Sequence, residues 1–279
     1  PVIDSLYIMK QIQAQGGFME KEIQAIFLDV GNTLRILTQN EAHQAAARQN
    51  IVQLLQCQED PSSFCSKLDE RYKVYRKWAF ENMREAPESE LWTRWLAPEF
   101  PKERVAALGV ELTYQYRQSM GLRVVVEHAR EVVQMLYQRG YILGIISNLI
   151  TSQEIPDWLI EDDLAQYFKS IALSAVLGIR KPDPAIYHYA AQQAGVEPAL
   201  CAYVGDNLKR DVTGTRAAGF GLAVIINSPE DLAKAHITDE NRPDAIIHSF
   251  LDLLNLFPQA PQVCLQAATQ PLTMQTVAN

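Results

Sequence analysis

Short apolar runs alternate with stretches of helical periodicity from about residue 130 onward, and one further apolar run stands near the start of the chain. A first apolar run, IQAIFLDV at 23–30, ends in an acidic residue and Gly31-Asn32, which is typical of a buried parallel strand. Further strands are predicted near 141–147, 170–173, 202–206, 222–227 and 244–248. Helices are predicted at 131–139, 157–168, 184–194, 211–218 and 250–257. This rhythm predicts an α/β fold, with a Rossmann-like parallel sheet covered by helices on both faces.

The segment that follows the first strand has a different pattern. Between Asn40 and Met120 there is one glycine, Gly109, and the apolar positions recur at steps of three and four residues. We therefore predict an all-helical domain inserted after the first strand. The predicted boundaries are an N-terminal arm at 1–20, an α/β core at 21–39 and 122–258, a helical insert at 40–121, and a C-terminal tail at 259–279.

Composition excludes several classes of protein. The 279 residues carry 25 Lys+Arg against 33 Asp+Glu, a net charge of −8, which argues against a general nucleic-acid binder. No run of 18 apolar residues exists, so no membrane span is predicted. The first 22 residues lack the basic start and apolar stretch of a signal peptide, and we expect a cytoplasmic protein. Oligomeric state is left open by the sequence.

Chemistry-bearing residues follow several of the predicted strands. Asp29 ends the first strand, Ser147-Asn148 end the second, and Asp206 ends the fourth, with Asp211 five residues later. Lys181 lies in a loop before a predicted helix. Ligands bind beyond the carboxyl ends of parallel strands, so we expect these groups on one rim of the sheet. A carboxylate can attack phosphorus, further carboxylates can hold Mg²⁺, and a lysine with a hydroxyl can grip phosphoryl oxygens.

This ordered set of motifs resembles the haloacid dehalogenase (HAD) superfamily of hydrolases, mostly phosphatases, over residues 21–258. The helical insert looks like the α-helical cap of that family, of the C1 type. The resemblance implies that Asp29 is the nucleophile that becomes a phosphoaspartate. It also implies that Ser147, with the backbone amide of Asn148, binds the transferring phosphoryl group. Lys181 would bridge the nucleophile and the phosphate.

The resemblance also implies a Mg²⁺ cofactor. Its protein ligands would be Asp29, the backbone carbonyl of Gly31, Asp206 and, often through water, Asp211. We assign Thr33 to substrate binding. The partner implied is a small phosphorylated metabolite, and neither a nucleic acid nor a membrane is expected.

One position departs from the family pattern. Family phosphatases usually carry a second aspartate, two residues after the nucleophile, that protonates the leaving oxygen, and here that position is Gly31. Such a general acid/base is worth about 10²–10⁴-fold in rate. Substrates with good leaving groups, water, or a residue from elsewhere such as His43 are alternatives. A weakly catalytic phosphate- or partner-binding protein, or a dehalogenase-like hydrolase, also stays open.

Overall fold

The computed structural model describes residues 22–260, so the predicted arm and most of the predicted tail lie outside the described residues. Its centre is a parallel sheet of six strands in the order β5-β4-β1-β6-β7-β8. The predicted α/β class is confirmed. The strands are β1 (Ala25–Leu28), β4 (Ile142–Ser147), β5 (Phe168–Leu173), β6 (Cys201–Gly205), β7 (Leu222–Ile226) and β8 (Ala245–Ile247).

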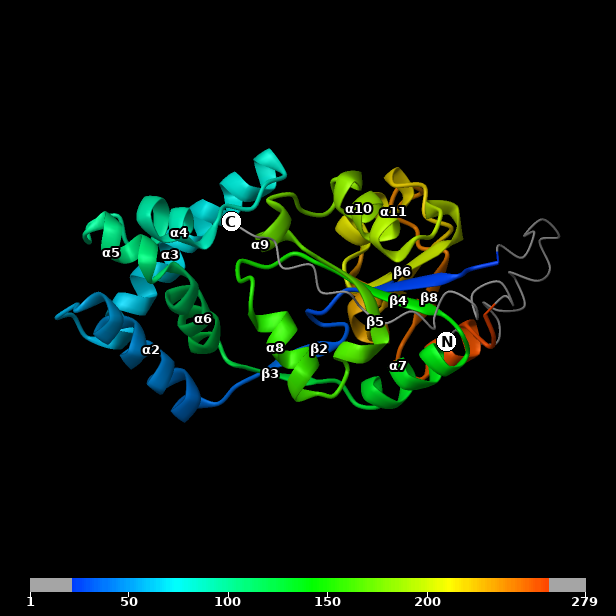
Figure 1. Ribbon diagram of the computed structural model, residues 1–279, viewed down its shortest axis with the longest axis horizontal. Helices are drawn as coiled ribbons and strands as arrows, with labels where there is room; N and C mark the ends of the chain where they lie inside the picture. The colour runs from blue at the N-terminus through cyan, green and yellow to red at the C-terminus, as the bar shows by residue number, and fades with distance from the viewer. Residues whose placement is uncertain (1–21, 261–279) are drawn as a thin grey trace.

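Strand β1 is buried on both faces, as its unbroken apolar run predicts. Ile26 and Leu28 pack into one hydrophobic cluster, and Ala25 and Phe27 pack into another on the opposite face. Figure 1 shows helices on both sides of the sheet, with α7 on one side and α10 and α11 on the other. The core helices are α7 (Ala129–Gln138), α8 (Glu154–Glu161), α9 (Ser174–Leu177), α10 (Pro184–Ala194), α11 (Thr213–Ala217), α12 (Pro229–Lys234) and α13 (Asp252–Leu256).

Residues 41–119, which lie between the first two strands of the sheet along the chain, form a helical unit at one end of the molecule (Figure 1). Its helices have a hydrophobic cluster of their own, built around fully buried aromatic side chains such as Tyr75, Trp92 and Tyr116. We call this unit the helical insert. Its elements are α2 (Glu41–Leu55), α3 (Pro61–Asn82), α4 (Glu88–Glu90), the π-helix η1 (Leu91–Leu96), α5 (Lys102–Ala107) and α6 (Gly109–Ser119).

Two short antiparallel strands that the sequence did not reveal connect the sheet to the helical insert. β2 (Arg35–Thr38) leaves the core and β3 (Leu122–Val125) returns to it, so the chain crosses as a paired ribbon. Both are four residues long and only partly buried, which leaves little apolar pattern to detect. Arg35 anchors the ribbon through a buried ion pair, 2.7 Å from Asp162.

Other boundaries differ locally from the prediction. The helix expected at 157–168 is shorter and earlier, and residues Ala165–Tyr167 form a 3₁₀ turn, η2, just before β5. A second such turn, η3 (Pro198–Leu200), precedes β6. The helix expected at 211–218 begins earlier, with a π-helical turn, η4, at Leu208–Val212. Within residues 22–260, no helix is both long and apolar enough to cross a membrane.

Candidate active site

Asp29 lies at the centre of the carboxyl rim of the sheet. Leu28 is in register with Ile145 of β4 and Val204 of β6, so Asp29 stands between the ends of both neighbouring strands. Its side chain is buried, and Oδ1 accepts hydrogen bonds from Ser147 Oγ at 3.0 Å and from the amide of Val30 at 2.7 Å. The predicted nucleophile and the predicted phosphoryl-binding hydroxyl are therefore in direct contact.

Lys181 contacts the other oxygen of the same carboxylate. Its ammonium lies 3.0 Å from Asp29 Oδ2 and 3.2 Å from Asp211 Oδ1, and its side chain is fully buried. It also donates a hydrogen bond to the hydroxyl of Tyr203. Burial and the nearby Asp211 raise the pKa of Tyr203 well above its ordinary value, so this hydroxyl stays protonated and accepts from the lysine.

Asn148 has a role that the sequence did not suggest. Its side chain grips the backbone of Lys181 twice, because Nδ2 donates to the lysine carbonyl at 2.9 Å and Oδ1 accepts from the lysine amide at 2.8 Å. This pair of bonds fixes the lysine loop against the end of β4. Asn148 is thus a positioning residue for Lys181, besides any contact of its own amide with substrate.

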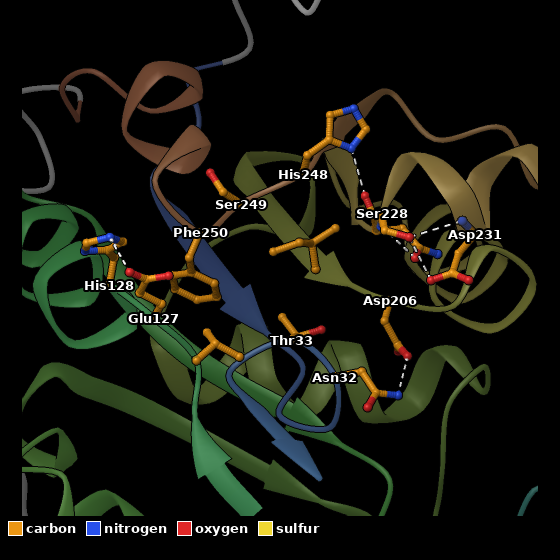
Figure 2. Close-up of a pocket in the computed structure, with 13 residues that line it drawn as sticks. Asn32, Thr33, Glu127, His128, Asp206, Ser228, Asp231, His248, Ser249 and Phe250 are labelled. Carbon is orange, nitrogen blue, oxygen red and sulfur yellow. Dashed lines mark hydrogen bonds and ion pairs between the residues drawn. The ribbon is translucent and has the colours of Figure 1, made fainter. Parts of the chain in front are cut away.

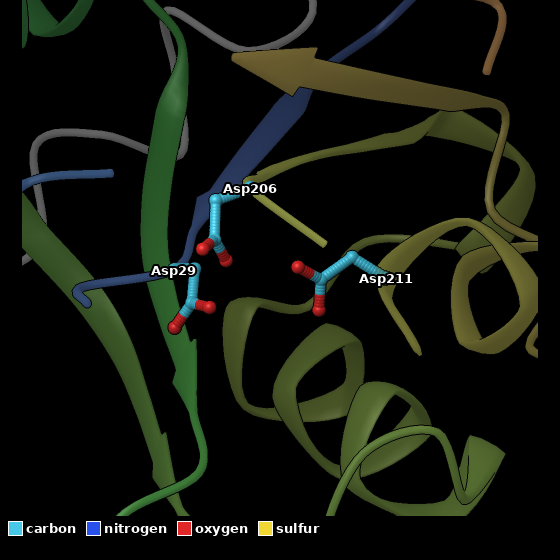
Figure 3. A group of neighbouring side chains, drawn as sticks. All are labelled: Asp29, Asp206 and Asp211. Carbon is cyan, nitrogen blue, oxygen red and sulfur yellow. The ribbon is translucent and has the colours of Figure 1, made fainter. Parts of the chain in front are cut away.

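Three aspartates converge beside Lys181. Each of Asp29, Asp206 and Asp211 offers a carboxylate oxygen, and these oxygens lie within 4.8 Å of one another. Figure 3 shows the three side chains pointing toward a common space from separate segments of the chain. Asp206 is held by Asn32, whose Nδ2 donates to its Oδ2 at 3.0 Å. A set of hard carboxylate oxygens suits a hard divalent cation such as Mg²⁺, so these residues fit the predicted metal.

Arg210 is the main residue of the site that sequence reasoning missed. Its guanidinium bonds to all three aspartates, 2.8 Å from Asp29 Oδ2, 3.1 Å from Asp206 Oδ1 and 2.8 Å from Asp211 Oδ1. A weak signal was present in the sequence, because Arg210 directly precedes Asp211 and stands four residues after Asp206, so a basic side chain lies close in sequence to both predicted metal ligands. The π-helical turn η4 carries both Arg210 and Asp211, and from it the guanidinium reaches Asp29.

The charges of the site shift its pKa values in opposite directions. Burial, reinforced by Asp29, raises the pKa of Asp206 above its ordinary value. Burial opposes ionisation of Asp211 as well, but Lys181 and Arg210 together hold the pKa of Asp211 below its usual range. For Arg210, burial acts to lower the pKa, yet the pairing with Asp211 and Asp29 raises it. Asp211 is therefore ionised, and it pairs with both Lys181 and Arg210.

Gly31 and Thr33 complete the loop that follows Asp29. A Cβ atom built on Gly31 would meet no heavy atom within 4 Å, so the position has room for a side chain. Thr33 is fully buried, and its hydroxyl has no hydrogen-bond partner among residues 22–260. His43, considered as a replacement acid, instead bonds through Nε2 to Gln118 of the helical insert at 3.0 Å.

A cavity of about 660 Å³ opens beside Asp206. It extends from Asn32 and Thr33 toward the ends of β7 and β8 (Figure 2). Its wall is mostly polar, with Ser228 bonded to Asp231 at 2.8 Å and His248 bonded to the carbonyl of Asn227 at 2.8 Å. A small polar molecule therefore has space next to the aspartates.

The helical insert contacts the core next to the lysine loop. Glu85 of the insert is buried, lies 3.2 Å from Arg180, and accepts a hydrogen bond from Ser174 at 2.8 Å. It also accepts from the hydroxyl of Tyr75 within the insert. Arg180 directly precedes Lys181, so this buried contact ties the position of the insert to the loop that carries the catalytic candidate.

Comparison with known proteins agrees with this geometry. The family model of haloacid dehalogenase-like hydrolases matches residues 23–219. The chain belongs to the haloacid dehalogenase-like hydrolases. The resemblance inferred from the motifs is thereby confirmed at the level of the family.

Individual relatives are similar over part of their length. The haloacid dehalogenase-like hydrolase domain-containing protein 3 of Bos taurus is 35% identical over 111 residues, 40% of this chain and 43% of the relative. A glyceraldehyde 3-phosphate phosphatase of Methanopyrus kandleri is 29% identical over 126 residues, 44% of this chain and 52% of the relative. The chain thus spans about half the length of the curated relatives it matches.

A solved structure supports the fold alone. The 2-haloacid dehalogenase from Pseudomonas syringae pv. Tomato DC3000 superposes with a TM-score of 0.62 and 22% identity, covering 85% of this chain and 98% of that one. Phosphatases and dehalogenases therefore both occur among the proteins that this HAD-like chain resembles.

Proposed function

We propose that this HAD-like protein is a Mg²⁺-dependent hydrolase of a small phosphorylated metabolite, acting through an aspartyl phosphate on Asp29. The observation that carries the proposal is the direct contact of Asp29 with Ser147 at 3.0 Å and with Lys181 at 3.0 Å, beside the group of three aspartates. Three of the relatives bear phosphatase names, which supports attack on the phosphorus of a phosphate ester over displacement of a halide from carbon.

The proposed reaction has two balanced steps. In the first, an oxygen of Asp29 attacks phosphorus as the P–O bond to the leaving group breaks, and the leaving oxygen takes a proton from water. In the second, water hydrolyses the acyl phosphate, which releases inorganic phosphate and restores the carboxylate. Ser147 orients the phosphoryl group, and the buried ammonium of Lys181 offsets the charge on its oxygens.

A divalent cation bound by Asp29, Asp206, Asp211 and the Gly31 carbonyl would neutralise phosphoryl charge as a Lewis acid. The missing carboxyl at Gly31 favours substrates whose leaving group needs little protonation, such as acyl phosphates. The polar cavity next to Asp206 offers a place for the remainder of a small substrate.

The test is a panel of phosphomonoesters and acyl phosphates assayed for phosphate release, with Mg²⁺ and with a chelator. Wild type should be active only with Mg²⁺, and Asp29→Asn should be inactive. The exposed Asp157 of α8 provides a matched control, because Asp157→Asn makes the same change at an aspartate outside the group of three. Mass spectrometry of acid-quenched enzyme should find one added phosphoryl group, on the peptide that contains Asp29.

The same panel separates the alternatives. A 2-haloacid is included because halide departs without a proton and so does not require the acid that Gly31 lacks. Halide release without phosphate release would replace the proposal by a dehalogenase-like hydrolase. Binding of phosphate esters with no turnover of any substrate would replace it by a weakly catalytic or non-catalytic phosphate-binding protein.

A further inference from the structure

The guanidinium of Arg210 lies where the three carboxylates converge. One nitrogen, NH2, is 2.8 Å from Asp29 Oδ2, 3.1 Å from Asp206 Oδ1 and 2.9 Å from Asp211 Oδ2. The adjacent Nε is 2.8 Å from Asp211 Oδ1. A single nitrogen therefore contacts oxygens of every aspartate in the group that fits a metal.

A divalent cation held by these aspartates would take carboxylate oxygens at coordination distance, about 2.0–2.1 Å for Mg²⁺, with Asp211 bound directly or through water. A guanidinium nitrogen at hydrogen-bond distance from all three carboxylates occupies the space in which such an ion would be bound. The two cations consequently exclude each other on steric as well as electrostatic grounds.

Arg210 also engages the proposed nucleophile. Oδ1 of Asp29 accepts from Ser147 and the amide of Val30, while Oδ2 faces both Lys181 and Arg210. Both oxygens of the carboxylate are thus bonded in this arrangement. Departure of the guanidinium would leave Oδ2 with Lys181 as its remaining partner. It would also open the space between the aspartates.

We propose that Arg210 is a tethered counter-ion that competes with the divalent cation for Asp29, Asp206 and Asp211 and holds the hydrolase in a resting arrangement. The proposal rests on the proposed function, because it concerns the metal site of that enzyme. It assigns to Arg210 a regulatory role: metal binding requires the side chain to swing out, and metal loss lets it return.

The surroundings allow that movement. The side chain of Arg210 is 23% exposed, and it follows the exposed Lys209 on a single π-helical turn, so it borders solvent. The carboxylates keep other partners when it leaves. Asp206 retains Asn32 at 3.0 Å, and Asp211 retains Lys181 at 3.2 Å together with the amide of Asn207 at 3.0 Å.

The first test measures Mg²⁺ binding to metal-free protein by titration calorimetry, for wild type, Arg210→Gln and Lys209→Gln. The lysine variant is the matched control, because it removes the same charge from the same turn without touching the aspartates. If the guanidinium fills the site roughly nine-tenths of the time, the dissociation constant of Arg210→Gln should fall about tenfold. Lys209→Gln should stay close to wild type.

The second test uses the wild-type fold and so does not depend on the glutamine variant being stable. The Nε–H resonance of Arg210 is identified in a ¹⁵N spectrum by its absence from the spectrum of Arg210→Lys. Its hydrogen bond to Asp211 should be lost when Mg²⁺ is added, which shifts or broadens the signal. A signal that stays unchanged at saturating Mg²⁺ overturns the proposal.

The outcomes also separate this proposal from the proposed function. One outcome is that Arg210→Gln and Lys209→Gln bind Mg²⁺ with equal affinity while the wild type hydrolyses phosphate esters with Mg²⁺. That result refutes the competition between Arg210 and Mg²⁺ but not the proposed hydrolase activity. Absence of Mg²⁺ binding in all three proteins refutes both the competition and the metal-dependent reaction.

Discussion

The ammonium of Lys181 lies 3.0 Å from Oδ2 of Asp29, and neither side chain has more than a few per cent of its surface in contact with solvent. A fully buried ammonium requires partners that compensate its charge, and here Asp29, Asp211 and the hydroxyl of Tyr203 supply them. The contact that would position the lysine in the proposed reaction therefore also supports the fold.

Replacement of Lys181 by methionine should lower both activity and stability. The variant leaves two buried carboxylates with Arg210 as their remaining strong counter-charge, and breaking a buried pair costs about 3–5 kcal/mol. Urea unfolding measures the loss. Lys169→Met, at an exposed lysine of β5, should change the free energy of unfolding by less than about 0.5 kcal/mol. Equal stability of the two variants would contradict the structural role of Lys181.

Substitution of Gly31 by aspartate should raise the rate of hydrolysis of substrates with poor leaving groups. A side chain has room at this position, and a carboxyl there could protonate the leaving oxygen, a contribution of about 10²–10⁴-fold. The measurement is kcat for an alkyl and an acyl phosphate. The gain should be larger for the alkyl phosphate, and Gly31→Ala should give none. An equal gain with alanine would show that the carboxyl is not acting as an acid.

Substitution of Gly205 by alanine should disturb the site even though only one methyl group is added. The new Cβ would lie 2.4 Å from Oδ2 of Asp211, a distance that forces the carboxylate to move. We expect weaker Mg²⁺ binding and a stability loss of about 1–3 kcal/mol. Gly31→Ala is the control, since its methyl group meets no neighbour within 4 Å. Wild-type Mg²⁺ affinity in Gly205→Ala would exclude Asp211 from the metal site.

The contact between the helical insert and the core should make stability depend on pH through Glu85. Burial raises the pKa of this carboxyl, although Arg180 opposes the shift. The folded state therefore binds its proton more tightly than the unfolded chain, whose value is near 4.5. The resulting stabilisation is complete below that value and is lost as pH rises through the folded pKa.

Glu85→Gln isolates this contribution, because glutamine keeps the shape of the side chain and does not titrate. Relative to the variant, the wild type should lose stability as pH is raised from about 4 to about 7. Urea unfolding of both proteins at a series of pH values gives the difference. A difference that stays constant over this range would show that Glu85 does not change its protonation there.

The sequence by itself determined the strands of the sheet and the polar residues that directly follow three of them. A buried parallel strand has a local run of apolar residues in the sequence. The residues directly after such a run lie at the edge of the sheet where the strands end. The order of residues alone therefore places Asp29, Ser147 and Asp206 on the same edge of the sheet. The helical insert was equally visible, because helical periodicity is also a local pattern.

Only the tertiary structure decided which groups meet between these strands. Arg210 contacts Asp29 across 181 positions of sequence, and Asn148 grips Lys181 across 33. Such contacts depend on the parallel register of β1 with β4 and β6 and on the π-helical turn that aims the arginine inward. Sequence periodicity records which face of an element is apolar, whereas the direction of one long polar side chain is set by charges brought together from distant segments.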